Sequence, residues 1–185
     1  MIENRRNELK KYLSKINIKE IKEATEKAID NLPDYFFSVP ASSGGKYHPS
    51  FNLGDGGLFR HSCFCVDIIL ELFNIYTLTE EEKSIIVSAL ILHDGKKHGE
   101  IQSKHTVKSH PIIMANWLRE LWKDEMTESL NQVINAISSH MGFWNTSENG
   151  NMPTPQTKIE KFVHLGDYLG SRKIYDNYYK GEVND

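Results

Sequence analysis

The sequence has very little cysteine, no long hydrophobic run and no excess of positive charge. Cys63 and Cys65 are its only cysteines, too few and too close together for a disulfide framework or a four-cysteine zinc site. No segment approaches the roughly 18 consecutive apolar residues of a membrane span, and residues 1–6 lack the apolar core of a signal peptide. These absences predict a soluble protein of a reducing, cytoplasmic compartment that has no membrane partner.

The charge balance restricts the class of partner. A formal net charge of -3 argues against binding long duplex nucleic acid by charge alone, which usually requires a basic face. A local basic pocket remains compatible with that balance. With 185 residues, 39% of them hydrophobic, the chain is long enough for one well-buried core, so we expect a single domain over residues 1–185.

No segment alternates apolar and polar residues with period two, and the predicted fold class is therefore all-α. Residues 1–32 form an amphipathic helical segment, with a break expected near Asn17. The role of this segment stays open, because it could pair with a second copy in a homo-oligomer or fold back as a lid. Residues 32–57 contain prolines and glycines and read as a long loop. The aromatic residues of this loop favour an ordered conformation packed on the helices.

The remaining helices are delimited by recognisable ends. A helix is expected over residues 58–76, and a capping box from Thr79 to Glu82 opens another that reaches His93. His110, followed by proline, begins the next helix, and a further one ends near His140 with a glycine just beyond. A last clear helix, over about 159–170, carries Asp167 on its apolar face.

Six side chains at or near these helix ends suit a pair of divalent metal ions, since imidazoles bind transition metals and a carboxylate can bridge two ions. The apolar run at residues 89–92 leads directly to two adjacent polar residues, a costly burial unless both are satisfied. The alternative is an aspartate that caps the following turn beside a histidine hydrogen-bonded in the core. The candidate ligands are His61, His93, Asp94, His110, His140 and Asp167.

These residues lie within blocks that resemble the HD-domain superfamily of metal-dependent phosphohydrolases, with an all-α bundle as the implied fold. The first block is similar to the GGLxxH entry of a branch that includes a bacterial 3′–5′ exoribonuclease. The others resemble the LLHDxxK, HPxxGAxxL, ISSHHG and LLHxADxLD motifs of HD relatives. The resemblance covers about residues 40–173 and rests on five blocks in order: 56–62 (GGLFRHS), 90–97 (LILHDGKK), 110–115 (HPIIMA), 137–142 (ISSHMG) and 163–169 (VHLGDYL).

The resemblance implies one metal held by His61, His93, Asp94 and Asp167, with Asp94 bridging to a second metal. The second metal would be held by His110 and His140. One or two ions of Mn, Fe, Co, Ni or Zn are expected, with Mn or Fe favoured. Two departures stand out. The glycine of the HDxGK pattern has moved one place, and Met141 replaces the second histidine of many relatives, which predicts a weaker or exchangeable second metal.

The implied reaction is hydrolysis of a phosphoester or phosphodiester of a nucleotide or short oligonucleotide by metal-activated hydroxide. No Gly-x-Ser-x-Gly elbow offers a competing nucleophile. Asp94, Lys97 and His98 are the predicted catalytic residues, although Lys97 also fits a solvated lysine. His105 and His164 fit no ligand block and are predicted to be structural or at the surface. Candidate substrate-binding residues are Lys46, Tyr47, His48, Trp144, Asn145, Arg172 and Lys173.

Three other functions remain in view. A 3′–5′ exonuclease on single-stranded nucleic acid would need a basic groove leading to His61. A nucleotide-binding or sensing module without turnover finds its only support in Met141. The intact residues His61, His93, Asp94 and Asp167 weigh against it, since a degenerate site would be expected to lose a ligand. A structural zinc site needs four ligands, fewer than the six candidates here.

Overall fold

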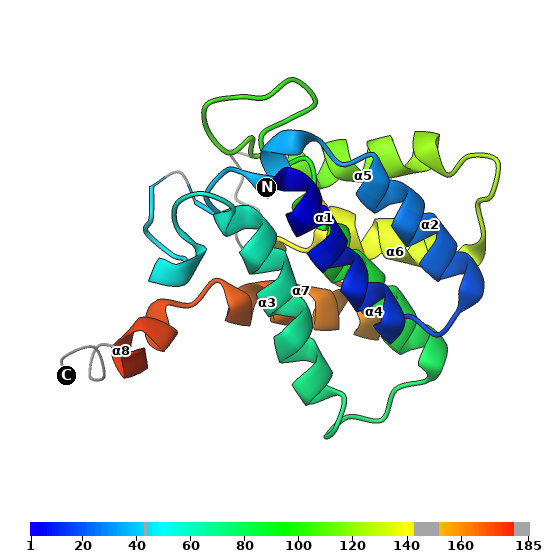
Figure 1. The fold of residues 1–185 in the computed structure, drawn as a ribbon. Helices are drawn as coiled ribbons and strands as arrows, with labels where there is room; N and C mark the ends of the chain where they lie inside the picture. Colours follow the sequence, from blue (N-terminus) through cyan, green and yellow to red (C-terminus); the bar gives the residue numbers. More distant parts are fainter. Residues whose placement is uncertain (43, 143–151, 180–185) are drawn as a thin grey trace.

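The computed structural model describes residues 1–42, 44–142 and 152–179, and within these ranges every regular element is a helix. This confirms the predicted all-α class. Figure 1 shows the helices packed around a central one, α4. The α-helices are α1 (Ile2–Lys10), α2 (Lys19–Asp30), α3 (Gly57–Leu72), α4 (Glu80–Leu92), α5 (His110–Leu121), α6 (Glu128–Ser139), α7 (Lys158–Gly170) and α8 (Asp176–Tyr179).

Helix α4 is the core of the bundle because it is apolar on all sides. Its residues from Ser84 to Leu92 are all buried, and it packs against α2, α3, α6 and α7. A helix without a polar face is stable only when neighbours surround it. The capping box at Thr79 and Glu82 starts the helix as predicted. Its other end therefore delivers His93 and Asp94 into the middle of the molecule.

The N-terminal segment breaks where the sequence indicated. Helix α1 runs into a 3₁₀ turn at Lys11–Lys15, and α2 begins at Lys19, so Asn17 lies in the break. The apolar side chains of both helices join the same hydrophobic cluster as α4. Thr25 of α2 also forms a buried 2.7 Å hydrogen bond with Ser88 of α4, between the two hydroxyl oxygens.

Helix α3 is shorter than predicted, since it ends at Leu72 rather than near residue 76. Beyond it, Ile75 and Tyr76 are 73% and 49% exposed. The apolar residues therefore continue in the sequence after the helix has left the core. The helix ends where its packing against the core ends, and the spacing of apolar residues in the sequence does not reveal that point.

Loop 38–57 precedes α3. Backbone hydrogen bonds connect residues within this loop and also connect the loop to the helix. The amide of Ala41 donates to the carbonyl of Asn52 (3.0 Å), and the amide of Gly56 donates to that of Ser38 (2.9 Å). A Cβ atom at Gly57 would lie 2.0 Å from the Asn52 carbonyl oxygen, so only glycine permits this approach. None of the helices in the described ranges has the length and apolar character needed to cross a bilayer.

Candidate metal centre

The fold brings all six predicted metal ligands together at one end of α4. His61 comes from α3, His110 is the first residue of α5, and His140 caps the end of α6. Asp167 lies on α7, while His93 and Asp94 follow the last residue of α4. The four histidines and Asp94 are at most 2% exposed. Ligands at helix ends converge in this way because each helix body can pack while its end points inward.

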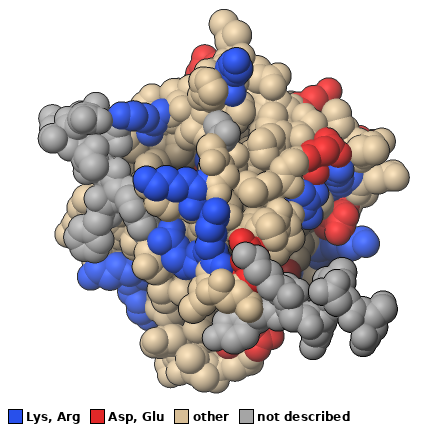
Figure 2. Space-filling view, turned by 90° about the vertical axis from the view of Figure 1, so that its left-hand side faces the viewer, with Lys and Arg blue, Asp and Glu red and all other residues tan. Residues whose placement is uncertain are grey.

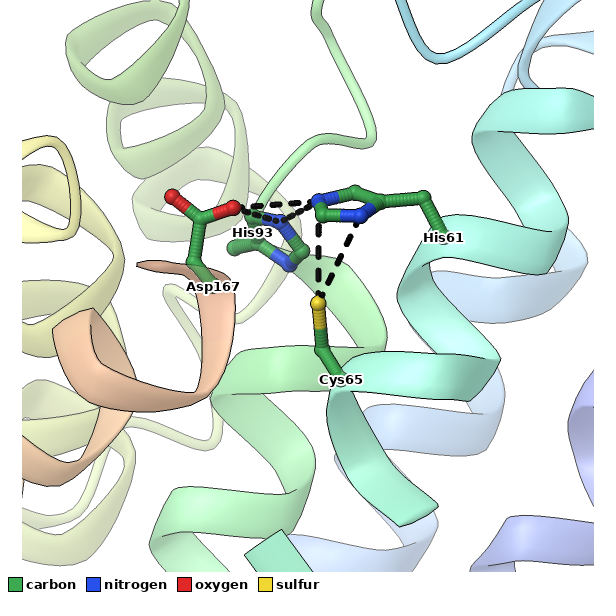
Figure 3. Close-up of side chains that lie close together, drawn as sticks. All are labelled: His61, Cys65, His93 and Asp167. Atoms are coloured by element: carbon green, nitrogen blue, oxygen red, sulfur yellow. Dashed lines mark hydrogen bonds and ion pairs between the residues drawn. The ribbon is translucent and has the colours of Figure 1, made fainter. Parts of the chain in front are cut away.

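The first half of the cluster contains His61, His93 and Asp167, which point toward one another in Figure 3. The Nε2 atom of His61 lies 3.0 Å from Asp167 Oδ1 and 3.4 Å from Nε2 of His93. One oxygen of Asp94, Oδ2, faces this group, at 3.4 Å from His93 Nε2 and 3.7 Å from His61 Nε2.

The second half is formed around the other oxygen of Asp94. Its Oδ1 atom lies 3.0 Å from Nε2 of His110 and 3.7 Å from Nε2 of His140. The two oxygens of one carboxylate therefore face two different sets of imidazoles. This is the arrangement expected of a carboxylate that bridges two metal ions.

Backbone carbonyls orient three of the imidazoles. Nδ1 of His93 donates to the carbonyl of Leu90 at 2.8 Å, and Nδ1 of His110 donates to that of Val107 at the same distance. Nδ1 of His140 donates to the Ile137 carbonyl at 2.7 Å. A carbonyl can only accept, so in each neutral ring the lone pair lies on Nε2, which faces the centre. Hydrogen bonds of this kind fix the tautomer and orientation of metal-binding histidines.

Unpaired polar atoms show that the residues fit a metal. Nε2 of His110 and Oδ1 of Asp94 lie 3.0 Å apart, and both are buried without a hydrogen-bond partner among the described residues. Burying such atoms unpaired is costly, and a cation between lone pairs removes that cost. Donor groups compatible with one ion are His61, Cys65, His93 and Asp167, and also His93, Asp94 and His140.

Burial and charge set the protonation of the ligands. Burial lowers the pKa of His140 to about 3 and also lowers the pKa of His61, which favours the neutral, metal-binding form. Burial opposes ionisation of Asp94, but the positive charges of Lys97 and His93 outweigh it and hold the pKa of this carboxyl well below its usual range. At His93 burial is likewise outweighed, and the carboxylates of Asp94 and Asp167 raise the pKa to about 10.

We therefore expect metal binding to release a proton from His93. With a pKa of about 10 this ring is protonated at neutral pH, and a ligand must be deprotonated to bind a metal. The apparent affinity for the ion held by His93 should fall roughly ten-fold for each unit by which the pH is lowered between about 9 and 6. Calorimetric titration with Mn²⁺ at pH 8, in buffers of different ionisation enthalpy, counts the protons. An enthalpy that is the same in every buffer would contradict this expectation.

A pocket of about 330 Å³ opens onto the centre. Asp94, Asp167, His110 and His140 form one side of it, and several predicted substrate or catalytic residues also line it. These are Tyr47, His48, Lys97 and Arg172.

Two of these residues have informative contacts. His48 is 8% exposed, and its ring centroid lies 4.7 Å from that of His61. Within the part of the chain that the structure describes, neither of its ring nitrogens has a hydrogen-bond partner. Burial lowers its pKa to about 2. The Lys97 ammonium lies 2.5 Å from Asp94 Oδ2.

Other predicted residues lie elsewhere. His98 is buried, donates from Nδ1 to the Ser103 carbonyl at 2.8 Å and is not among the residues that line the pocket. Lys46 and Lys173 are exposed and do not line it either. Trp144 and Asn145 lie outside the described residues. The roles assigned to all these residues stay predictions.

Cys65 was not among the predicted ligands of the centre. Its sulfur lies 3.6 Å from both ring nitrogens of His61, beneath the ring in Figure 3. Its position four residues after His61 on one helix was the available signal, because such residues share a face. Ser42, Thr106 and Ser171 also line the pocket and carried no signal. His164, predicted to be structural or at the surface, is half-buried and donates from Nδ1 to the His140 carbonyl at 2.7 Å.

Comparison with known families identifies this arrangement. A model of the HD domain matches residues 58–171, which is more than half of the chain. The chain belongs to the HD-domain family. HD domains bind divalent metals and belong to a superfamily of metal-dependent phosphohydrolases, in agreement with the cluster described above. No curated protein and no solved structure matches the chain.

The HD match contains all six predicted ligands and ends beside the pocket at Ser171. It supports the superfamily, while the exoribonuclease-like branch stays a prediction. The match excludes α1, α2 and loop 38–57, although this loop carries His48. The HD match thus contains all the candidate metal ligands, while Tyr47 and His48, which also line the pocket, precede it.

Proposed function

We propose that this HD-domain protein hydrolyses a phosphoester or phosphodiester of a nucleotide or short oligonucleotide. The observation that carries the proposal is the position of Asp94, whose two oxygens face two separate sets of histidines at the floor of a pocket. A structural metal site would be closed. This centre is bordered instead by a pocket with room for a small ligand.

The donor set determines what chemistry is available. Two divalent ions would lower the pKa of water and neutralise negative charge on phosphoryl oxygens. His61, His93, Asp94 and Asp167 would hold one ion, and Asp94, His110 and His140 the other. A set of imidazoles and carboxylates suits Mn or Fe.

The other residues of the pocket would bind and orient the substrate. The ammonium of Lys97 and the guanidinium of Arg172 line the pocket and attract phosphate. His48 adds a donor and an acceptor that are unpaired within the described protein. We assign Lys97 to a phosphoryl oxygen and His48 to a polar group of the substrate, where its ring would gain a partner.

The charge on the surface supports an anionic substrate. Figure 2 shows lysine and arginine side chains gathered in the middle and on the left of one face, while acidic side chains lie mainly on its right. This is the side of the molecule on which loop 38–57 lies. A chain with a net charge of -3 thus presents a locally basic face. The same face favours a second candidate, a 3′–5′ exonuclease, because single strands track basic surfaces.

Hydrolysis by the protein stripped of metal and reloaded with Mn²⁺ tests the proposal. The panel contains nucleoside mono-, di- and triphosphates, linear and cyclic dinucleotides, and single-stranded oligomers, with Asp94→Ala as the blank. Turnover by the wild type alone supports the proposal, and the best substrate separates a nucleotide hydrolase from an exonuclease. Metal binding without turnover anywhere in the panel would favour a binding module.

Replacing His48 by phenylalanine should raise KM for the best substrate roughly ten-fold and leave the metal content unchanged. The variant keeps an aromatic ring against His61 but removes both nitrogens, and a lost hydrogen bond of about 1.4 kcal/mol corresponds to ten-fold. Steady-state kinetics and metal analysis of His48→Phe and of His105→Phe, an exposed control, provide the check. An unchanged KM would remove His48 from the substrate site.

A further inference from the structure

We propose that residues 1–37 position the two loops that border the pocket. Arg5 acts on loop 38–57, and Tyr35 acts on loop 95–109. Neither residue lines the pocket, and both precede the HD-domain match, so they are positioning residues rather than catalytic ones. The inference rests on the proposed function, since it concerns how that substrate pocket is held.

Arg5 joins α1 to both ends of loop 38–57. One guanidinium nitrogen donates to the carbonyl of Phe37 at 2.7 Å, and the other lies 2.5 Å from Oδ2 of Asp55. The planar guanidinium therefore spans the residues at which the loop leaves the N-terminal segment and returns to α3. Gly56 makes room for it, because a Cβ atom there would lie 2.6 Å from Cζ of Arg5. No other side chain offers two such donors in fixed geometry.

The loop whose two ends are joined by Arg5 is the one that carries His48. Next to the arginine, the Gly56 amide donates to the Ser38 carbonyl and the Leu58 amide donates to the Val39 carbonyl, both at 2.9 Å. These two bonds hold the segment that enters the loop against the segment that leaves it. His48 lies between them in the sequence, with its ring against His61. A loop tied at its ends loses little additional entropy when its middle residues bind a ligand.

Tyr35 has the corresponding role on the other loop. Its hydroxyl donates to the Gly99 carbonyl at 2.7 Å in a buried position, and its ring lies 5.6 Å from that of His98. The same loop includes Lys97 and Thr106, which line the pocket, and it leads into the ligand His110. His98 thereby gains a structural explanation, since it packs between Tyr35 and its own loop.

The docking of α1 does not depend on Arg5. Lys10 pairs with Asp30 of α2 at 2.6 Å, and Arg6 donates to carbonyls at the end of α2, including that of Leu32 at 3.4 Å. Leu9 is fully buried. These contacts join α1 to α2 and leave the loops untouched. Lys10→Ala is therefore a matched control, because it removes an ion pair of the same helix without altering loop 38–57.

Hydrogen–deuterium exchange and kinetics on the Mn²⁺-loaded chain of 185 residues test the proposal. Arg5→Ala should speed amide exchange within residues 38–58 and raise KM roughly ten-fold, with kcat and metal content nearly unchanged. Tyr35→Phe should speed exchange within residues 96–109 instead. Arg5→Lys, which can keep the pair with Asp55 but not both contacts, should recover part of the loss. Lys10→Ala should leave both loops and KM as in the wild type.

Three results would overturn the proposal: unchanged loop exchange in Arg5→Ala, equal acceleration in Lys10→Ala, or a loss confined to kcat. Exchange is measured without substrate, so its outcome is separate from that of the proposed function. If the wild type hydrolyses nothing in the panel while Arg5→Ala still loosens residues 38–58 selectively, the positioning role stands and the hydrolase assignment fails.

Discussion

Replacing Asp94 by asparagine should abolish turnover, by at least about 10³-fold, and remove most of the bound metal. The amide has nearly the same shape as the carboxylate but lacks its charge and offers only one oxygen. Oδ1 and Oδ2 of Asp94 face different histidine pairs, so one substitution damages both halves of the centre. Metal analysis and Mn²⁺-dependent hydrolysis measure the two losses separately.

The control for this variant is Asp124→Asn, at an exposed position. It should behave as the wild type in both assays. Circular dichroism of Asp94→Asn should still show the helical fold, because the hydrophobic core around α4 is unaltered. Activity of Asp94→Asn within ten-fold of the wild type would rule out the metal centre as the site of hydrolysis.

Replacing His110 by alanine should lower the number of bound metal ions from two to one and reduce turnover by about 10²-fold. The Nε2 atom of His110 lies 3.0 Å from Asp94 Oδ1, and no described residue forms a hydrogen bond with it. His61, His93 and Asp167 are untouched, so the first ion should remain. Metal titration of the stripped protein gives the stoichiometry.

His105→Ala is the matched control for this second prediction, because it removes an exposed histidine five residues earlier. It should retain two ions. If His110→Ala also retained two ions with unchanged affinity, the assignment of the second set would be wrong. A wild type that binds only one ion would instead make Met141, which stands at the second histidine of the ISSHHG motif, the residue to replace next.

The helices and the cluster of candidate ligands could be predicted because local chemistry marks them. A capping box starts α4, a proline follows His110 at the start of α5, and the apolar run before His93 requires a buried helix. Each of these signals depends on residues a few positions apart. The end of α3 was misplaced because it depends on where the helix leaves the core.

The walls of the pocket were only partly predictable, because they are built by contacts between distant residues. The loop was named as a candidate, but nothing in the sequence indicated that the His48 ring lies against His61. Cys65 and Thr106 were missed, and the Arg5 contact with Asp55 joins residues 50 positions apart. Side-chain contacts over such separations leave no periodic trace in the chain.

The sequence by itself therefore determined the all-α class and the HD-domain family, and it named the six candidate ligands that the fold brings together. It did so because helix ends, apolar periodicity and short motifs are local properties. Only the tertiary structure decided which oxygen of Asp94 faces which histidines, which nitrogens remain unpaired, and which residues hold the pocket walls. Those features follow from how the helices pack around α4, where the cost of burying unpaired polar atoms is set by neighbours distant in the chain.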